Sequence, residues 1–264
     1  MKPELSPKQY NREIQAQRIL EGESFTELRT WYQERLKSFP EYSVKNADLT
    51  DGSNWKAKLT PEGQVEEVDG GFFTLKGQTI TITKPDGTTM GWTQPGLLQK
   101  EGSVTILTSE GVEEITASGF VGVIKDTDGN ILLTLAQEPF ALTPKKVLAR
   151  TPIQTSAAKL ASVLSGDISK DKAMYEFMST VTESENISTF FGEHAQDIFP
   201  LPYADANRIQ ATNIGFVTTI SEPAMREAVT KNGQNRWCTL KEVSQLAKAG
   251  ILNGHTAAAV LAAN

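Results

Sequence analysis

Glu138 has the residue type and the position that acid–base chemistry needs. It directly follows the apolar segment Ile131 to Gln137, whose composition predicts a central strand of a sheet. A positioned carboxylate at the end of such a strand can take up or deliver a proton in a reaction. The other interpretation is a strand-end carboxylate that faces solvent, and the residues alone leave both open.

The remaining candidate ligands and nucleophiles are few. His194 and His255 are the only histidines, and without a convergent cysteine or aspartate pattern they give little support for a metal site. His255 is expected to cap the last helix or to face solvent. Cys238 is the single cysteine, so an intramolecular disulfide and a cysteine zinc cluster are excluded, and we expect it to be a small buried apolar residue. No G-x-S-x-G motif supports a serine nucleophile.

The overall composition excludes several classes of protein. The chain has 264 residues and a formal net charge of −6 at pH 7, whereas general nucleic-acid binders carry clustered basic residues. No apolar run approaches the ~18 to 20 residues that span a bilayer. The start of the sequence, Met1 to Glu4, lacks the apolar core of a signal peptide. We therefore expect a cytoplasmic protein without membrane contact, and a few cations focused in one cleft could still bind an anionic small ligand.

We expect an N-terminal helical extension over residues 1–23 and a single domain over residues 24–264. Ser6 and Pro7 predict the start of a first helix over 6–20. Ser24 and Glu27 predict a capping box that begins a second helix. After Pro152 the apolar period becomes helical, which predicts helices at 157–164 and 170–181, a strand at 208–220, a helix after 221, a capping box at 239–242 and a closing helix at 256–263.

Between these helical parts the chain is rich in strands. Alternating apolar residues and turn signals predict strands at 71–75, 78–83, 88–93, 104–108, 112–116, 119–125 and 131–137. Asp86-Gly87 and the loop 126–130 supply hairpin turns. The stretch 70–99 is therefore expected to be a meander that ends in a turn at Trp92-Thr93-Gln94-Pro95 and forms one wall of a small-molecule pocket.

Several of these segments resemble, in order, the motifs of the NDP-hexose 2,3-dehydratase family. Phe72 to Gly77 and Trp92 to Pro95 are similar to the family's F-F-x-V-x-G and W-x-Q-P signatures. The other matches are Trp31 to Arg35 with a W-x-x-E/x-R helix, Gln137 to Pro139 with A-K-x-E-P, Thr151 to Thr155 with S-P-T-V-Q-A-T, an Asn207-Arg208 pair, Arg236 to Leu240 with W-x-T-L-x-Q-L, and Gly254 to Ala257 with the closing helix. The resemblance covers roughly residues 24–264.

The resemblance implies an α+β fold like that of Nudix hydrolases, a mixed or antiparallel sheet packed with helices. The family acts on a nucleoside-diphosphate 4-keto-6-deoxyhexose, which loses water across C2 and C3 without a metal or a redox cofactor. This reaction needs an acid, a base and hydrogen-bond donors to the enolate oxygen. The implied catalytic residues are Glu138, Gln154 and Thr155. The implied substrate-binding residues are Trp92, Gln94, Gln137, Ser156, Lys159, Asn207 and Arg208, with Lys145, Lys146 and Arg150 as further candidates for the diphosphate of a suspected dTDP-sugar.

The chain also departs from the family pattern. The family histidine before S-G-F-F is replaced within 68–71, its arginine is replaced near Ala157, and 140–142 replaces its glycine-asparagine loop. A catalytically inactive nucleotide-sugar-binding or structural module is therefore the alternative to a lyase. The family usually carries two modules in tandem, so the single module predicts a homodimer.

Overall fold

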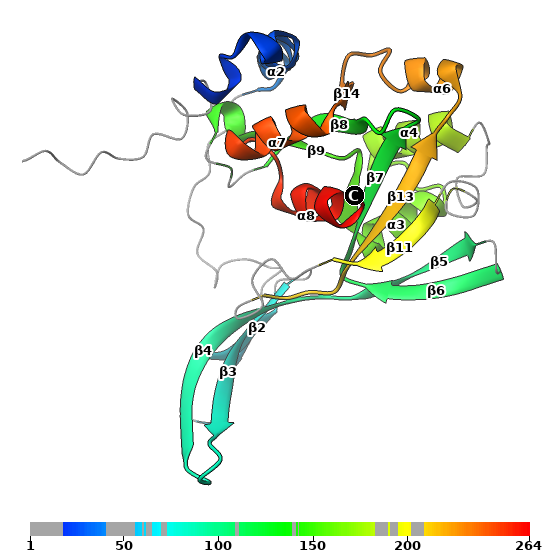
Figure 1. Cartoon of the computed structure of the whole chain (residues 1–264). Helices are drawn as coiled ribbons and strands as arrows, with labels where there is room; N and C mark the ends of the chain where they lie inside the picture. Colours follow the sequence, from blue (N-terminus) through cyan, green and yellow to red (C-terminus); the bar gives the residue numbers. More distant parts are fainter. Residues whose placement is uncertain are drawn as a thin grey trace, which may run out of the picture.

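The computed structural model describes residues 18–40, 56–59, 61, 65–69, 73–108, 111–138, 141, 143–182, 190, 195–201 and 209–264. Figure 1 shows a central sheet with helices on both faces and a long two-stranded arm that projects away from it. The α+β class expected from the sequence is confirmed. The first predicted helix lies outside the described residues except for 18–20, which are helical.

The central sheet is mixed and has seven strands. Its order is β11-β13-β7-β8-β14, with β10 paired to β7 and β9 paired to β8. β13 runs parallel to β7. The other pairs are antiparallel: β10 with β7, β9 with β8, and β14 with β8. The bounds are β7 (Gly119–Asp126), β8 (Ile131–Gln137), β9 (Val147–Arg150), β10 (Ile153–Ser156), β11 (Ala195–Pro200), β13 (Asn213–Ile220) and β14 (Asn235–Cys238).

The predicted hairpin of β7 and β8 is confirmed, and a carboxylate shapes its turn. The Oδ1 atom of Asp126 accepts hydrogen bonds from the backbone N–H groups of Asp128 (2.9 Å) and Asn130 (2.8 Å). Arg226 donates to the other oxygen of Asp126 from 2.5 Å, and Gly129 takes a φ of 78°. These bonds fix the register of two strands whose side chains are buried on both faces of the sheet.

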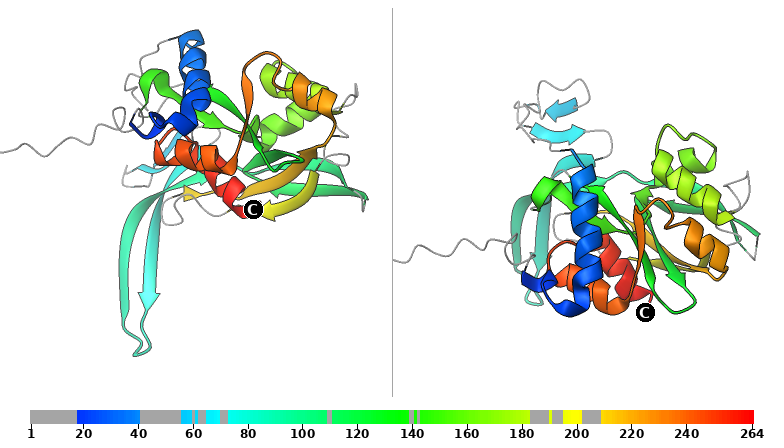
Figure 2. Two further views of the ribbon diagram at one scale, coloured as in Figure 1. Left: turned by 45° about the horizontal axis from the view of Figure 1, so that its top comes forward. Right: turned by 90° about the horizontal axis from the view of Figure 1, so that it is seen from above.

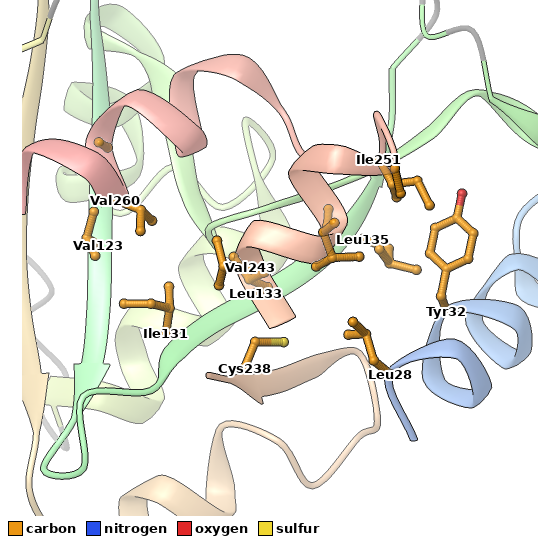
Figure 3. Close-up of a cluster of buried hydrophobic side chains, with 14 of the residues drawn as sticks. Leu28, Tyr32, Val123, Ile131, Leu133, Leu135, Cys238, Val243, Ile251 and Val260 are labelled. Atoms are coloured by element: carbon orange, nitrogen blue, oxygen red, sulfur yellow. The ribbon is translucent and has the colours of Figure 1, made fainter. Parts of the chain in front are cut away.

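On one face of the sheet, α2 (Thr26–Ser38), α7 (Leu240–Lys248) and α8 (Gly254–Ala262) cover the first core cluster. Figure 3 shows Leu28 and Tyr32 of α2 approaching the cluster from one side and Val243 of α7 from the other. Cys238 is fully buried in this cluster, and burial raises the pKa of its thiol to about 12. The prediction of a buried apolar cysteine is therefore confirmed.

The second core cluster lies on the opposite face. It is covered by α3 (Ala157–Leu164), α4 (Lys172–Thr182), α6 (Pro223–Ala228) and the hairpin of β5 (Gly102–Thr108) and β6 (Gly111–Ala117). β7 contributes to both clusters, because Phe120 and Ile124 face this side while Val121 and Val123 face the first. The domain is therefore a sheet between two helical layers (Figure 2).

The arm consists of β3 (Phe73–Thr83) and β4 (Thr89–Gln99). Together with β1 (Lys56–Leu59), β2 (Val65–Asp69) and β12 (Ile209–Gln210) they form a second sheet, and Figures 1 and 2 show the β3–β4 hairpin extending beyond the body. The Asp86-Gly87 turn is confirmed, with φ of 81° at Gly87. The predicted turn at Pro95 is wrong, because β4 continues through it opposite Gly77. Among the described residues, β12 pairs with β4 at Leu97 and Leu98, so Pro95 interrupts no described backbone hydrogen bonding on that edge of β4.

Helix starts follow the predicted caps in some places and depart from them in others. The capping box at Thr239 and Glu242 is confirmed, and α3 has the predicted bounds. The box at Ser24 is wrong: Glu23–Phe25 form a 3-10 turn (η1), and α2 begins at Thr26 without a side-chain cap. Asp171 accepts a hydrogen bond from the Met174 N–H at the start of α4. Among the described helices, none has the length and apolarity to cross a membrane.

Candidate functional site

Two polar side chains and one backbone carbonyl meet beside β8, β9 and β10. The Nη1 atom of Arg150, the last residue of β9, lies 3.8 Å from Oε1 of Glu138, which directly follows β8. The same Nη1 donates to the backbone carbonyl of Gln154 in β10 at 3.3 Å. The side chains of Glu138 and Arg150 are 29% and 25% exposed, so both are screened from bulk water but open to a ligand. The cluster can therefore present a carboxylate and a guanidinium to one substrate, with the Gln154 backbone close by.

The start of α8 locks this cluster from the far end of the chain. The segment before α8 runs beside β9, with the Ala149 N–H donating to Ile251 and the Asn253 N–H donating to Ala149. Thr256 then donates from its hydroxyl to Oε1 of Gln154 (2.9 Å) and accepts from the Thr151 N–H (3.1 Å). The oxygen of the Gln154 amide is therefore held in place, and its NH₂ group has no hydrogen-bond partner among the described residues.

His255 lies next to this cluster in the first turn of α8. Burial lowers the pKa of its imidazole, and the nearby Glu138 carboxylate opposes that shift. The expectation that His255 caps α8 is wrong, because Asn253 does so: its Oδ1 accepts from the N–H groups of His255 (2.9 Å) and Thr256 (3.4 Å). A neutral imidazole close to Glu138 is thus an additional polar group at the site.

Other predicted site residues have structural partners. Gln137 donates from its amide to the Pro40 carbonyl at 2.8 Å, and Ser156 caps α3 by accepting from the Lys159 N–H. Lys159 itself lies 2.8 Å from Asp171. Thr155 alternates with Gln154 along β10, so its side chain is on the other face of the sheet, where its buried Oγ1 has no hydrogen-bond partner among the described residues.

Four other predicted residues have side chains that lie outside the description. Positions 92 and 94 lie in β4, within the projecting arm, and their side chains are outside the description. Asn207 and Arg208 fall outside the described residues, as does His194. Of the predicted set, Glu138 and the backbone of Gln154 thus both lie near Arg150, while Trp92 and Gln94 lie in a different part of the fold.

A cleft adjoins the cluster and shares Arg150 with it. Its volume is about 360 Å³, within the usual range of small-molecule sites. It lies between the end of α2, the middle of β8, α4 and the segment between α6 and β14. The lining residues are Arg35, Phe39, Thr134, Leu135, Ala136, Arg150, Pro152, Asp171, Ala173, Met174, Glu176, Phe177, Thr180, Ala228, Val229, Asn232, Gln234 and Asn235.

Comparisons were made with models of known protein families and with curated proteins. No family model and no curated protein matches this chain. Function is therefore inferred from the geometry of the strand-end cluster and the cleft, together with the motif resemblance.

Sequence reasoning missed Arg35 and Thr256 as parts of this region. Arg35 stands in a segment that resembles a family helix, but the resemblance implies no ligand contact for it. Thr256 bonds to Thr151, 105 positions earlier, so no local pattern could reveal the contact. Within the described residues, no group of three or more His, Cys, Asp and Glu side chains is arranged to hold a metal ion.

Proposed function

We propose that this protein is a lyase that removes water across C2 and C3 of a nucleoside-diphosphate 4-keto-6-deoxyhexose, on a Nudix-like α+β fold. The observation that carries the proposal is the contact of the Arg150 guanidinium with the Glu138 carboxylate and with the backbone carbonyl of Gln154. Glu138 and Gln154 belong to the segments that resemble the NDP-hexose 2,3-dehydratase family. The adjoining cleft supplies room for a small molecule.

In this proposal Glu138 acts as both base and acid. Its carboxylate takes the C3 proton, which the C4 ketone acidifies, and the electron pair of that C–H bond passes into an enolate. The enolate re-forms the ketone and expels the C2 hydroxyl, which leaves as water with the proton that Glu138 returns. The Gln154 NH₂ group and the Arg150 guanidinium supply the donors that stabilise the enolate oxygen. One water is lost, and no electrons are gained or lost overall.

Replacement of the carboxylate tests this role. We expect Glu138→Gln to lower turnover at least ~100-fold, the usual scale of a lost acid–base group, while substrate binding is retained. Glu222→Gln serves as control, because this exposed carboxylate precedes α6 and does not line the cleft. Mass spectrometry of a dTDP-4-keto-6-deoxyhexose incubated with each protein measures the loss of water. Equal rates for wild type and Glu138→Gln would remove Glu138 from the mechanism.

The alternative function is a nucleotide-sugar-binding module without catalysis. It is favoured by the structural partners of Gln137, Ser156 and Lys159, which leave fewer groups for substrate. Thermal or chemical unfolding with thymidine diphosphate separates the outcomes, because a ligand at ~100 times its dissociation constant adds ~2.7 kcal/mol of stability. Stabilisation without water loss would establish the binding module. The absence of both stabilisation and water loss would contradict both functions.

We also propose that the protein forms a homodimer through the arm. Ile82 and Met90 are paired across the arm and are 45% and 52% exposed. An isolated two-stranded ribbon is only marginally stable in water, so a covering partner is favoured. Residues 73–100 contain three lysines and one aspartate, whereas the β5–β6 hairpin contains glutamates and no basic residue. This charge complementarity favours a second copy of the chain, whose arm packs on the first protomer's hairpin.

The dimer has a direct test in the apolar pair of the arm. We expect the wild type to sediment as a dimer at micromolar concentration and the double variant Ile82→Asp, Met90→Asp to sediment as a monomer. The double variant Thr81→Asp, Thr83→Asp adds the same charge to the opposite face of β3 and should remain dimeric. A monomeric wild type would contradict the proposal.

A further inference from the structure

Arg150 leaves one edge of its guanidinium unused. Its Nη1 faces Glu138 and the Gln154 carbonyl. Its Nε is buried and has no hydrogen-bond partner among the described residues, and no described group bonds to Nη2. The Nε–H and one Nη2–H of an arginine point along the same edge, which is the side-on fork that grips two oxygens of a phosphate or carboxylate. Arg150 also lines the cleft.

Arg35 brings a second cation to the same cleft. Its guanidinium lies 5.5 Å from the centre of the Phe39 ring, and in the described part of the chain it has no ion pair and its Nε has no partner. A guanidinium stacked on an aromatic ring keeps its donors directed sideways, toward a ligand.

Both acidic residues of the cleft have a lysine partner. Asp171 lies 2.8 Å from Lys159 and also caps α4, while Glu176 lies 3.5 Å from Lys172. Among the described lining residues, the two arginines therefore carry the charge that is available to a ligand. Glu138 offsets part of the Arg150 charge, but from the Nη1 side and at 3.8 Å.

We propose that this cleft is an oxyanion-binding site, in which the Nε–Nη2 edge of Arg150 and the guanidinium of Arg35 grip the phosphates of a phosphorylated small molecule. Oxyanion binding stands on the cleft alone. Its identification as the diphosphate subsite of a nucleotide sugar rests on the proposed function and places the sugar toward Glu138, because Arg150 separates the cleft from that carboxylate.

Inorganic pyrophosphate is the probe that tests the site without turnover. Isothermal titration calorimetry should show binding to the wild type that weakens about tenfold or more in Arg35→Gln and in Arg150→Lys, since the lysine keeps the charge but loses the fork. Lys37→Gln is the matched control: it removes one positive charge from an exposed position of α2 that does not line the cleft, and its affinity should stay within about twofold of wild type.

A spectroscopic measurement on the wild type guards against variants that fail to fold. The Nε–H signals of Arg35 and Arg150 in nitrogen-15 NMR spectra should shift as pyrophosphate is added, and those of Arg29 and Arg236 should not. Unshifted Arg35 and Arg150 signals, no pyrophosphate binding at ~10 mM, or equal affinity in all variants would overturn the site. Pyrophosphate binding through the arginines without dehydration of a nucleotide sugar would keep the site and reject the lyase. Dehydration of the nucleotide sugar at an unchanged rate in both arginine variants would keep the lyase and reject the site.

Discussion

Thr256→Val tests whether the hydroxyl that joins α8 to β10 holds the strand-end cluster together. The valine keeps the shape of threonine and removes only the hydroxyl, which accepts from the Thr151 N–H and donates to Gln154. Thr151 and Thr256 are both fully buried, so the Thr151 N–H loses its partner out of reach of water. An unsatisfied buried donor costs about 1–3 kcal/mol and a lost hydrogen bond to a reorientable amide about 0.5–1.5 kcal/mol. We expect the free energy of unfolding to fall by about 2–4 kcal/mol.

Thr256→Ser is the matched control. It keeps the hydroxyl and removes one buried methyl group, a change that costs about 1 kcal/mol. Guanidinium denaturation followed by circular dichroism gives both free energies of unfolding. If the valine variant is as stable as the serine variant, the hydroxyl does not hold the cluster and the assignment of Thr256 is refuted.

Three further predictions concern packing and pH. Gly122→Ala should lower the free energy of unfolding by about 1–3 kcal/mol, because a Cβ there would lie 2.5 Å from Cζ of the buried Phe216, and an unchanged denaturation midpoint would contradict this. Burial lowers the pKa of the His255 imidazole, against the opposing effect of Glu138, so the folded state binds this proton less tightly than the unfolded state. The free energy of unfolding should therefore fall as the pH drops below 6.5, and His255→Gln should show a smaller fall. Burial raises the pKa of the Asp126 carboxyl, but hydrogen bonds from Asn130 and Asp128 and the Arg226 charge bring this pKa below 3.8. The free energy of unfolding should therefore fall as the pH drops below 3.8, and Asp126→Asn should lack this contribution to the fall in an acid titration.

Elements with strong local signals could be predicted from the sequence. The β7–β8 hairpin, α3 and the capping box at Thr239 each depend on residues within a few positions, where periodicity and cap chemistry act. The box at Ser24 failed because Thr26 donates to the Glu23 carbonyl and a 3-10 turn takes its place. The prediction at Pro95 was wrong because proline is tolerated in a strand where, as far as the described residues show, no neighbouring strand pairs with it on the outer edge.

The candidate site was only half predictable for a related reason. Glu138 directly follows a strand that the sequence could locate, but the contacts of Arg150 with Glu138 and with the Gln154 carbonyl depend on how β9 and β10 pair in the sheet. The parts supplied by α2 and α8 come from segments more than 95 residues away, as the Gln137–Pro40 and Thr151–Thr256 bonds show. Amphipathic spacing identifies which face of such a helix is buried, but not which strand end it reaches.

Arg150 connects the two halves of the region, and this has a consequence for Glu138→Gln beyond turnover. The glutamine removes the negative charge 3.8 Å from Nη1, so the guanidinium has less to hold it toward Glu138 and more charge to offer on its cleft edge. Pyrophosphate affinity should therefore stay equal or rise up to about threefold, which is the effect of ~0.6 kcal/mol from one partly exposed charge pair. The same titration that measures the arginine variants checks this expectation. Weaker binding in Glu138→Gln would mean that the carboxylate holds Arg150 in the binding geometry rather than competing for it.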